Sequence, residues 1–521
     1  MNKMLYADKL KRLDLLACAN NNDVRNITLA IHRNHSFEMI SSVINAFLYE
    51  SGLGADFIYS DYDDSFNFKA IEADLHILWI DLERYKITSV SDFVRERVAA
   101  LRAMVSQPIL VIYTGHENID SCADLTDCYF LSTDVLLKDM SYEIYDLSKE
   151  VLFGTKLSSA ACLELARILG MLYIPGILKP SLKAIVVDLD NTLYQGVLGE
   201  DGCNALVANN ELQTRLKELK DSGFFLCIAS KNEEEDVRQM FESRTDFILR
   251  WDDFTTCQIN WDSKDINLLK MAARLNIGTD AMLFIDDNPA EIQNVQSTGV
   301  KTILAGDDIN TVMKYYPGLL KLKKSEEDTI RAKDIQANQE RMALAQSLTP
   351  AQYFEKLGIK LEYHVNNKDQ IPRVAELLGK TNQFILDYLR SNETQVNEYM
   401  SDDNKCVITI RMSDNLSDSG VIAILLAHKN NGLFLDELTV SCRALGRNLE
   451  NVMLPYMFQV AADVLTTDKK ICISYKEGPR NGPALKWLAN LTEQKLSKEG
   501  FVMYKIPTNI DLTGLDVEVC K

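Results

Sequence analysis

The sequence predicts an α/β protein: a core domain built on a parallel sheet, a second α/β domain before it and an α+β domain after it. Three observations predict this. Strand-like and helix-like stretches alternate up to about residue 175. Polar residues then follow the ends of three apolar strands between residues 184 and 288. From about residue 350, successive apolar strands are joined by fewer helices, which is typical of an α+β domain. A chain of 521 residues has room for three or four domains of roughly 150 residues each.

The composition excludes several classes of protein. The net charge is −19 and no dense Lys/Arg stripe occurs, whereas nucleic-acid binding needs clustered positive charge. We expect the start of the chain to form an amphipathic helix rather than a signal peptide, and we expect no window to approach the roughly 20 apolar residues of a membrane span. The 11 cysteines are scattered and form no C-x-x-C pair. We therefore expect a reduced, cytoplasmic protein with no membrane or nucleic-acid partner.

The first domain alternates strands with helices. We expect helices at 36–49 and 95–105, and strands at 26–31, 55–60, 74–81 and 108–114. This order predicts a parallel sheet, with any ligand bound beyond the carboxyl ends of its strands. Ser36 follows the first strand and would be the nucleophile if the domain were a hydrolase. The alternative, that Ser36 caps the next helix, is favoured because neither G-D-S nor a late D-x-x-H occurs.

The stretch that carries the chemistry is Lys183–Asp201, KAIVVDLDNTLYQGVLGED. An apolar strand at 184–187 leads into Asp188 and Asp190, whose side chains leave a strand on the same side. Two such carboxylates repel each other unless a cation binds, and Mg²⁺ is the expected one. The alternatives are a plain turn or a calcium loop, but a calcium loop needs Gly where Leu193 stands.

Further polar residues follow the next strands of this domain. FFLCIAS ends at Ser230, Lys264 begins a helix, and AMLFI ends in Asp286-Asp287. In this order, Asp188-x-Asp190-x-Thr192, Ser230, Lys264 and Asp286-Asp287 resemble the motifs of the haloacid dehalogenase (HAD) phosphatase superfamily, whose core is a Rossmann-like parallel sheet.

The resemblance implies a role for each residue. Asp188 attacks phosphorus, and Asp190 acts as general acid and then general base. Mg²⁺ is held by Asp188, Asp286 and the backbone carbonyl of Asp190. Ser230 donates to phosphate oxygens and Lys264 neutralises their charge, although Lys264 could instead be a solvated lysine at a helix start. Second-tier residues, with turn or supporting roles as the alternative, are Thr192, Asn232 and Asp287.

The insert between Thr192 and the first helix is too short for a cap domain. An uncapped site accepts a large or protein-bound substrate, provided that something else shields it from water.

A narrower resemblance covers most of the chain. DLDNTLYQGVLGEDG, SKNEEEDV, INWDSK, FIDDNPAE, KTNQF and SCRALGR are similar to motifs of the FkbH-like branch, some of whose members carry an SGNH-hydrolase-like first domain. The branch implies dephosphorylation of 1,3-bisphosphoglycerate and loading of glyceryl onto an acyl carrier protein, in polyketide or surface-glycan pathways. Its acyl-carrying cysteine is absent near the first motif, where Leu189 and Leu198 stand. Cys203 or Cys442 would have to serve, unless both are structural.

The last domain is similar to the GCN5-related N-acetyltransferase (GNAT) fold. A loop between a strand and a helix there is suited to cradle a pyrophosphate; its residues are Arg443, Gly446, Arg447 and Asn448. The resemblance implies binding of coenzyme A or phosphopantetheine; the alternative is a domain that only recognises the carrier.

We expect an SGNH-like or flavodoxin-like domain at 1–175, a HAD phosphatase domain at 176–322, a solvent-exposed helical linker at 323–349 and a GNAT-like domain at 350–521. The leading hypothesis is a Mg²⁺-dependent phosphatase and acyltransferase. A plain phosphatase acting on a sugar phosphate or nucleotide sugar is the second. A carrier-binding scaffold with a vestigial site is the third.

Overall fold

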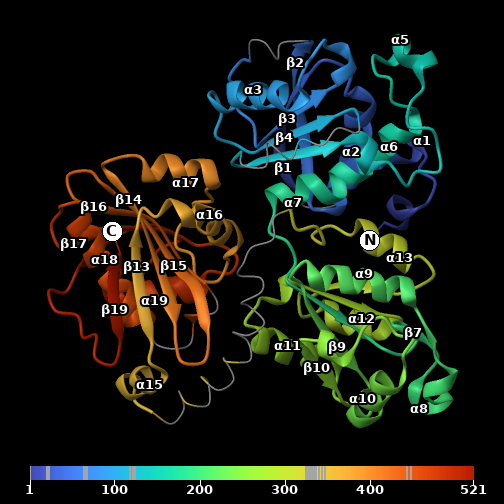
Figure 1. Ribbon diagram of the computed structural model, residues 1–521. Helices are drawn as coiled ribbons and strands as arrows, with labels where there is room; N and C mark the ends of the chain where they lie inside the picture. The colour runs from blue at the N-terminus through green and yellow to red at the C-terminus, as the bar shows by residue number, and fades with distance from the viewer. Residues whose placement is uncertain are drawn as a thin grey trace. The chain divides into compact units, whose positions relative to one another are not determined.

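The computed structural model of the chain describes residues 2–18, 24–62, 68–115, 119, 125–322, 337, 341, 344, 348–441, 444–445 and 449–520 (Figure 1). It divides into two compact units. The first joins Met1–Ser181 to Gly306–Leu322, and the second joins Leu182–Ala305 to Lys323–Lys521.

The first unit is built on a five-stranded parallel sheet, as expected. Its strand order, β2-β1-β3-β4-β5, is that of flavodoxin-like doubly wound sheets. The strands are β1 (Arg25–Arg33), β2 (Leu53–Tyr62), β3 (Leu75–Ile80), β4 (Ile109–Tyr113) and β5 (Cys128–Ser132). The edge strand β5 was not predicted, because its five residues show neither a long apolar run nor clear alternation.

Helices α2 (Glu38–Glu50), α3 (Val90–Arg102), α6 (Ser159–Ile168) and α7 (Ile174–Leu178) belong to this unit. With the π-helical turn between α6 and α7, the run Ser159–Leu178 is long and apolar enough to cross a membrane by length and composition, with mean hydropathy 1.6. The prediction that no window approaches the length of a membrane span is therefore wrong for these residues. Its apolar window is 67% buried, and a Cβ on Gly170 would lie 2.8 Å from the Phe47 Cβ of α2. This close packing is that of a core helix.

Residues 306–322 return to the first unit through α13 (Ile309–Tyr315). The Tyr315 hydroxyl donates to Glu164 Oε1 at 2.6 Å, and the Arg167 guanidinium lies 4.0 Å from the centre of the Tyr315 ring. These buried contacts tie α13 to α6.

The sheet of the middle domain is also parallel, with the order β10-β9-β6-β11-β12. Its strands are β6 (Ala184–Val187), β9 (Phe225–Ser230), β10 (Thr256–Ile259), β11 (Met282–Asp286) and β12 (Lys301–Leu304). Its helices are α9 (Asn210–Asp221), α10 (Glu234–Ser243), α11 (Lys264–Leu275) and α12 (Pro289–Gln296). The chain leaves β6 toward β9 and later reaches β11 on its other side. The carboxyl end of β6 is therefore the point where strand order reverses, the usual place for a ligand in such sheets.

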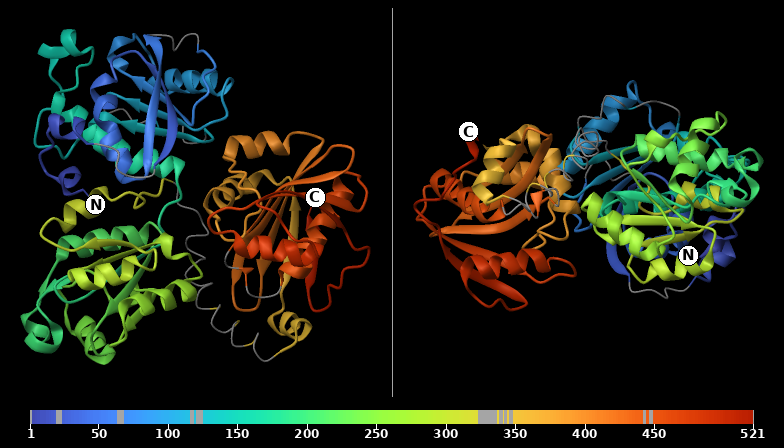
Figure 2. Two further views of the ribbon diagram at one scale, coloured as in Figure 1. Left: turned by 180° about the vertical axis from the view of Figure 1, so that it is seen from behind. Right: turned by 90° about the horizontal axis from the view of Figure 1, so that it is seen from below.

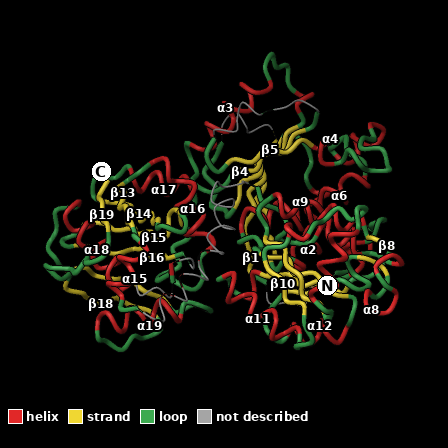
Figure 3. The backbone as a smooth tube through the Cα atoms, turned by 60° about the horizontal axis from the view of Figure 1, so that its bottom comes forward, coloured by secondary structure: helices red, strands yellow, loops and turns green. Residues whose placement is uncertain are grey.

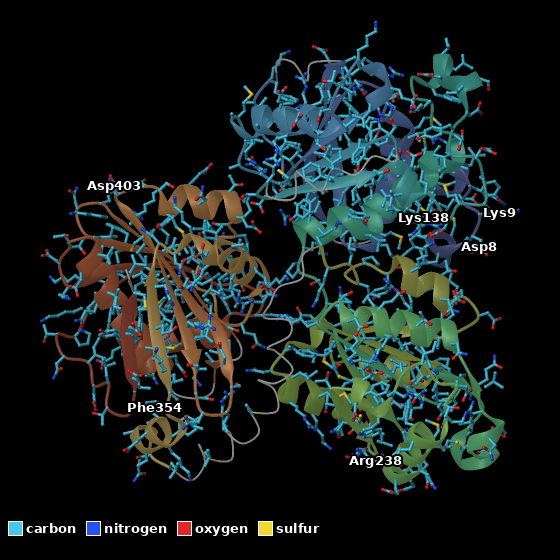
Figure 4. All side chains as sticks on the ribbon, viewed as in Figure 1. Asp8, Lys9, Lys138, Arg238, Phe354 and Asp403 are labelled. Atoms are coloured by element: carbon cyan, nitrogen blue, oxygen red, sulfur yellow. The ribbon has the colours of Figure 1, made fainter. Side chains whose placement is uncertain are left out.

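The insert after β6 is a small hairpin with one turn of helix. It consists of β7 (Tyr194–Gln195), α8 (Leu198–Asp201), a 3-10 turn at Cys203–Ala205 and β8 (Val207–Ala208). In keeping with its length, this segment contains no cap domain between residues 192 and 210, all of which the structure describes. In Figure 4, the labelled Arg238 marks α10, whose Arg238 guanidinium stacks on Trp251 at 4.1 Å.

The C-terminal domain is a seven-stranded, mostly antiparallel sheet with the order β18-β17-β16-β15-β14-β13-β19 (Figure 3). The strands are β13 (Lys360–Val365), β14 (Lys405–Ser413), β15 (Asp418–Lys429), β16 (Leu433–Val440), β17 (Lys470–Lys476), β18 (Glu499–Lys505) and β19 (Asp516–Cys520). Two neighbouring pairs, β16–β17 and β13–β19, are parallel. The short edge strand β19 was not predicted.

Helices cover both faces of this sheet, which Figure 2 shows from behind and from below. Helices α15 (Pro350–Leu357), α18 (Glu450–Val464) and α19 (Gly482–Thr492) pack with one set of strand residues, among them Cys406, Ile408 and Ile410. Helices α16 (Ile371–Lys380) and α17 (Glu393–Met400) pack on the other face, against residues such as Val407. The alternation along β14 follows the period of two of a strand covered on both faces.

The helical linker predicted at 323–349 differs from the expectation in its described residues. Ala337, Arg341 and Leu344 are helical, but Ala337 and Arg341 are buried rather than solvent-exposed. Arg341 binds both carboxylate oxygens of Asp414, at 2.6 and 2.8 Å, and donates to Ser417. The spacing of four between 337 and 341 places them on one face, which is docked on the C-terminal domain.

Candidate active site

Three carboxylates meet at the carboxyl ends of β6 and β11. In the parallel register of these strands Val187 lies opposite Ile285, so the next residues, Asp188 and Asp286, are neighbours. Oxygen atoms of Asp188, Asp286 and Asp287 lie within 4.8 Å of one another. Asp188 and Asp286 are buried, whereas Asp287 is partly exposed.

A single ammonium group lies between the two buried carboxylates. Lys264, the first residue of α11, places its Nζ 2.9 Å from Asp188 Oδ1 and 2.6 Å from Asp286 Oδ2. Its side chain is only 5% exposed. The alternative interpretation of Lys264 as a solvated lysine at a helix start is therefore wrong. Because three carboxylates share one ammonium group, the cluster lacks two positive charges for neutrality.

The pKa values reflect this shortage of positive charge. Burial, opposed by Lys264 and reinforced by the charge of Asp286, raises the pKa of Asp188 to about 6. Burial also raises the pKa of Asp286 and of Asp287, to which neighbouring carboxylates add. For Lys264, burial works against the charge, but Asp188 and Asp286 outweigh it and raise the pKa of the ammonium. Each carboxylate is thus less stable as an anion than it would be in water.

These residues fit a divalent cation. Hard oxygen donors converge, two of the three carboxylates are buried, and the local charge stays negative although Lys264 offsets part of it. Asp287, expected only to support the site, contributes its carboxylate to the group directly.

The carboxylate of Asp190 does not belong to this group. Its Oδ1 accepts hydrogen bonds from the Tyr194 hydroxyl at 2.7 Å and from the Leu198 backbone N–H at 3.0 Å. Its Oδ2 accepts one from Asn232 Nδ2 at 2.9 Å. Sequence reasoning missed Tyr194, because a two-residue strand gives no periodic signal.

The other predicted residues of the middle domain surround this centre. Ser230 is buried at the end of β9, and its Oγ accepts a hydrogen bond from Asn232 Nδ2 at 3.2 Å. Asn232 thereby joins Ser230 to Asp190 and is more than a turn residue. The Thr192 hydroxyl is buried and has no hydrogen-bond partner among the described residues.

The cysteine predictions have different outcomes. Cys203 lies in the turn after α8, with its Sγ 3.4 Å from Ser243 Oγ, and is partly exposed. Among the described residues, the Cys203 side chain forms no hydrogen bond with Asp188, Lys264 or Asp286. Cys442 and the predicted pyrophosphate loop lie outside the described residues; this applies to Arg443, Gly446, Arg447 and Asn448.

In the C-terminal domain, the segment 384–386 is hydrogen-bonded to two parallel strands. Parallel strands β16 and β17 pair only between Leu433–Leu435 and Ile471–Ile473. Beyond this pairing, the segment 384–386 bonds to both strands: the Val440 N–H donates to the Phe384 carbonyl, and the Lys476 N–H donates to the Leu386 carbonyl. The segment 384–386 therefore lies between the described ends of the two strands.

The N-terminal domain does not assemble a hydrolase triad around Ser36 in the part that the structure describes. The Ser36 hydroxyl donates to Glu38 Oε2 at 2.6 Å, and the neighbouring His35 ring directs its Nδ1 to Thr155. Ser36 is not the helix cap either, since α2 begins at Glu38 after Phe37. Asp81, which follows β3, instead forms an ion pair with Lys156, whose Nζ lies 3.1 Å from Asp81 Oδ1.

No protein-family model matches the sequence, and a search of curated proteins gives no match. Among solved structures, the chain is similar to the N-terminal part of the protein BF1531 from Bacteroides fragilis, which contains a phosphatase domain complexed with Mg. Identity is 19%, the match covers 62% of this chain and 98% of that chain, and the TM-score is 0.48.

Two further structures are similar over about a quarter of the chain. One is the HAD family enzyme bt-2542 from Bacteroides thetaiotaomicron with magnesium and inorganic phosphate, at 12% identity, covering 24% of this chain and 94% of that chain, with a TM-score of 0.21. The other is a mutant of SpeG spermidine N-acetyltransferase from Vibrio cholerae, at 12% identity, covering 26% of this chain and 77% of that chain, with a TM-score of 0.20. Because the identities and TM-scores of these matches are low, the chemistry of the site is inferred only from the residues of this chain.

Proposed function

We propose that the middle domain is a Mg²⁺-dependent phosphatase of the HAD type. The observation that carries this proposal is the buried arrangement of Asp188, Lys264 and Asp286, with Asp287 beside them and too little positive charge among them. A phosphorylated substrate brings further negative charge. A carboxylate can approach it only where a cation offsets the repulsion.

The residues divide the reaction into two displacements. In the first, a carboxylate oxygen of Asp188 forms a bond to phosphorus, and the bond from phosphorus to the leaving oxygen breaks. Asp190 gives its proton to that leaving oxygen. In the second, Asp190 takes a proton from water, and the resulting hydroxide attacks the phosphorus and releases Asp188 and phosphate. Lys264 holds Asp188 in place and offsets charge on the phosphoryl oxygens.

Asp188, Asp286 and Asp287 would hold Mg²⁺ by their carboxylates. When bound, the ion supplies charge neutralisation and polarises the phosphoryl oxygen. Ser230 is buried next to Asn232 and can donate to the phosphoryl group once its hydrogen bond to Asn232 rearranges.

For the substrate, we propose a phosphorylated three-carbon acyl donor such as 1,3-bisphosphoglycerate, with the thiol of an acyl carrier protein's phosphopantetheine arm as acceptor. Asp188 would remove the 3-phosphate, an alkyl phosphate, whereas the thiol would attack the acyl carbon, form the thioester and expel the 1-phosphate. The FkbH-like motifs around the site support this choice. The small β7–β8 hairpin, which leaves the site without a cap domain, also supports a substrate borne on a protein.

The test is intact-mass analysis of this protein and a carrier protein after incubation with 1,3-bisphosphoglycerate and Mg²⁺, with phosphate release measured in parallel. Release of phosphate together with a glyceryl adduct on the carrier supports the whole proposal. Phosphate release with unmodified proteins supports the phosphatase and contradicts acyl transfer. Asp188→Asn is the control, since it keeps the shape of the site and removes the nucleophile. No release from any phosphorylated substrate contradicts the proposal and favours a scaffold.

A further inference from the structure

The hairpin after β6 reaches the site through one buried side chain. Tyr194 is fully buried, and its ring packs against Phe247 with ring centres 5.9 Å apart. Among the described residues, Asp190 is the hydrogen-bond partner of its hydroxyl, at 2.7 Å. A phenylalanine would fill the same space, so packing alone does not explain the hydroxyl. A buried hydroxyl is retained where it has a partner to serve.

The Tyr194 hydroxyl is a constant donor. Burial, followed by the charge of Asp190, raises the pKa of Tyr194 far above its usual range, so the phenol stays protonated. The Leu198 N–H, at the start of α8, donates to the same oxygen. Asn232, after β9, donates to the other oxygen. The Asp190 carboxylate is thus held from two sides, by the hairpin and by the β9 loop.

Three hydrogen-bond donors fix the orientation of the Asp190 carboxyl group. When Asp190 passes its proton to the leaving oxygen, the donors already point at its oxygen atoms, so no group has to reorganise during the step. The fixed orientation also avoids the entropy cost of aligning the carboxyl with the leaving oxygen.

We propose that Tyr194 is a positioning residue for Asp190, through which the β7–β8 hairpin orients the proton donor toward the leaving oxygen of the substrate. This inference rests on the proposed phosphatase function. It adds a requirement: the hydroxyl matters most for substrates whose leaving group needs a proton.

Two substrates with different leaving groups separate positioning from structural support. Nitrophenolate leaves without help, whereas an alkyl alkoxide requires protonation. Tyr194→Phe should lower kcat/KM for an alkyl phosphate such as glycerol 2-phosphate roughly tenfold, and for p-nitrophenyl phosphate by less than about threefold. We use kcat/KM because it reports the step in which the leaving group departs.

A matched control and a second background complete the experiment. Gln213 is also fully buried and supports the same hairpin, since its Nε2 donates to the Leu193 carbonyl. Among the described residues, its hydrogen bonds go to Leu193, Ile248 and Leu249 and not to Asp190. Gln213→Met should reduce stability and lower both kcat/KM values by one common factor. In an Asp190→Asn background, Tyr194→Phe should cause no further change in the ratio of the two values, because residues acting through one group are not additive. Thermal melts of each variant with saturating Mg²⁺ report any loss of folding separately.

The outcomes distinguish the two levels of the proposal. A selective loss in Tyr194→Phe that vanishes in the Asp190→Asn background supports the inference. An active wild-type enzyme whose ratio is unchanged by Tyr194→Phe, or changed equally by Gln213→Met, overturns the inference and leaves the phosphatase standing. A wild-type protein that is inactive on both substrates with Mg²⁺ contradicts the phosphatase and the inference together.

Discussion

Replacing Lys264 by methionine removes the ammonium that lies between Asp188 and Asp286 while keeping most of the volume of the side chain. The two ion pairs measure 2.9 and 2.6 Å and involve side chains that are at most 9% exposed. At an effective dielectric constant of ~20, each pair represents about 6 kcal/mol of Coulomb attraction before desolvation. Because desolvation offsets much of this, we expect Lys264→Met to cost about 3–5 kcal/mol of unfolding free energy without metal, as breaking other buried pairs does.

Magnesium should reverse part of this loss, because it supplies the missing charge. At about 100 times its Kd, a ligand stabilises the folded state by about 2.7 kcal/mol. The variant should gain more than the wild type, since its site is more negative and binds Mg²⁺ more tightly. Phosphatase activity should nevertheless fall by about 10² or more, because Lys264 no longer neutralises the phosphoryl oxygens.

The assay is urea denaturation of the wild type and the variant, in EDTA and in saturating Mg²⁺. The control is Lys217→Met, in the same domain, where Lys220 also binds Asp253 and preserves its pairing. Because Lys217 is partly exposed and Asp253 keeps Lys220, this substitution should cost less than about 1 kcal/mol and should show no Mg²⁺ dependence. If Lys264→Met is as stable as the wild type in EDTA, or if Mg²⁺ stabilises both proteins equally, the charge-deficit reasoning is refuted.

Two further predictions follow from charge and burial. Because the pKa of Asp188 is raised to about 6, its protonated form stabilises the metal-free fold, and this contribution is lost as the pH rises through about 6. The raised pKa of Asp286 acts in the same direction. Since Mg²⁺ needs the deprotonated ligands, the Tm gain from Mg²⁺ should be larger at about pH 7.5 than at about pH 5; an equal gain at both pH values in calorimetry would contradict this sign. Arg341→Met should cost about 3–5 kcal/mol, because it leaves the fully buried Asp414 carboxylate without its bidentate partner. Chemical denaturation measures this cost, and Asp414→Asn in the Arg341→Met background should recover part of it. A loss below about 1 kcal/mol would show that Asp414 does not anchor the linker.

The centre of the site was predictable because a few local rules converge there. A short apolar strand followed by acidic residues occurs twice, at Asp188 and at Asp286, and parallel pairing brings such strand ends together. Lys264 was predictable as a residue of the site because a lysine at a helix start works against the helix dipole. Its burial between two carboxylates was visible only in the structure.

The residues around the centre depend on contacts that no periodicity shows. Tyr194 belongs to a two-residue strand, and Asn232 follows β9 in a loop, so neither pattern indicates that both reach Asp190. Arg341 lies in a charged, Gly-free segment that is typical of a solvated helix, yet its guanidinium is buried on Asp414. Ser36 follows a strand where a nucleophile is expected, but its hydroxyl donates to Glu38. In each case, the role of the side chain is set by a hydrogen-bond or ion-pair partner that the sequence pattern does not indicate.

The central claim is that Asp188 becomes phosphorylated, and peptide mass spectrometry tests it most directly. The protein is incubated with Mg²⁺ and a phosphate donor, quenched in acid to preserve an acyl phosphate, and digested. We predict a phosphoryl group on Asp188 in the wild type, none without Mg²⁺, and none in Asp188→Asn. Phosphate release with Asp188 unmodified under these conditions, or release that persists in Asp188→Asn, would contradict the account.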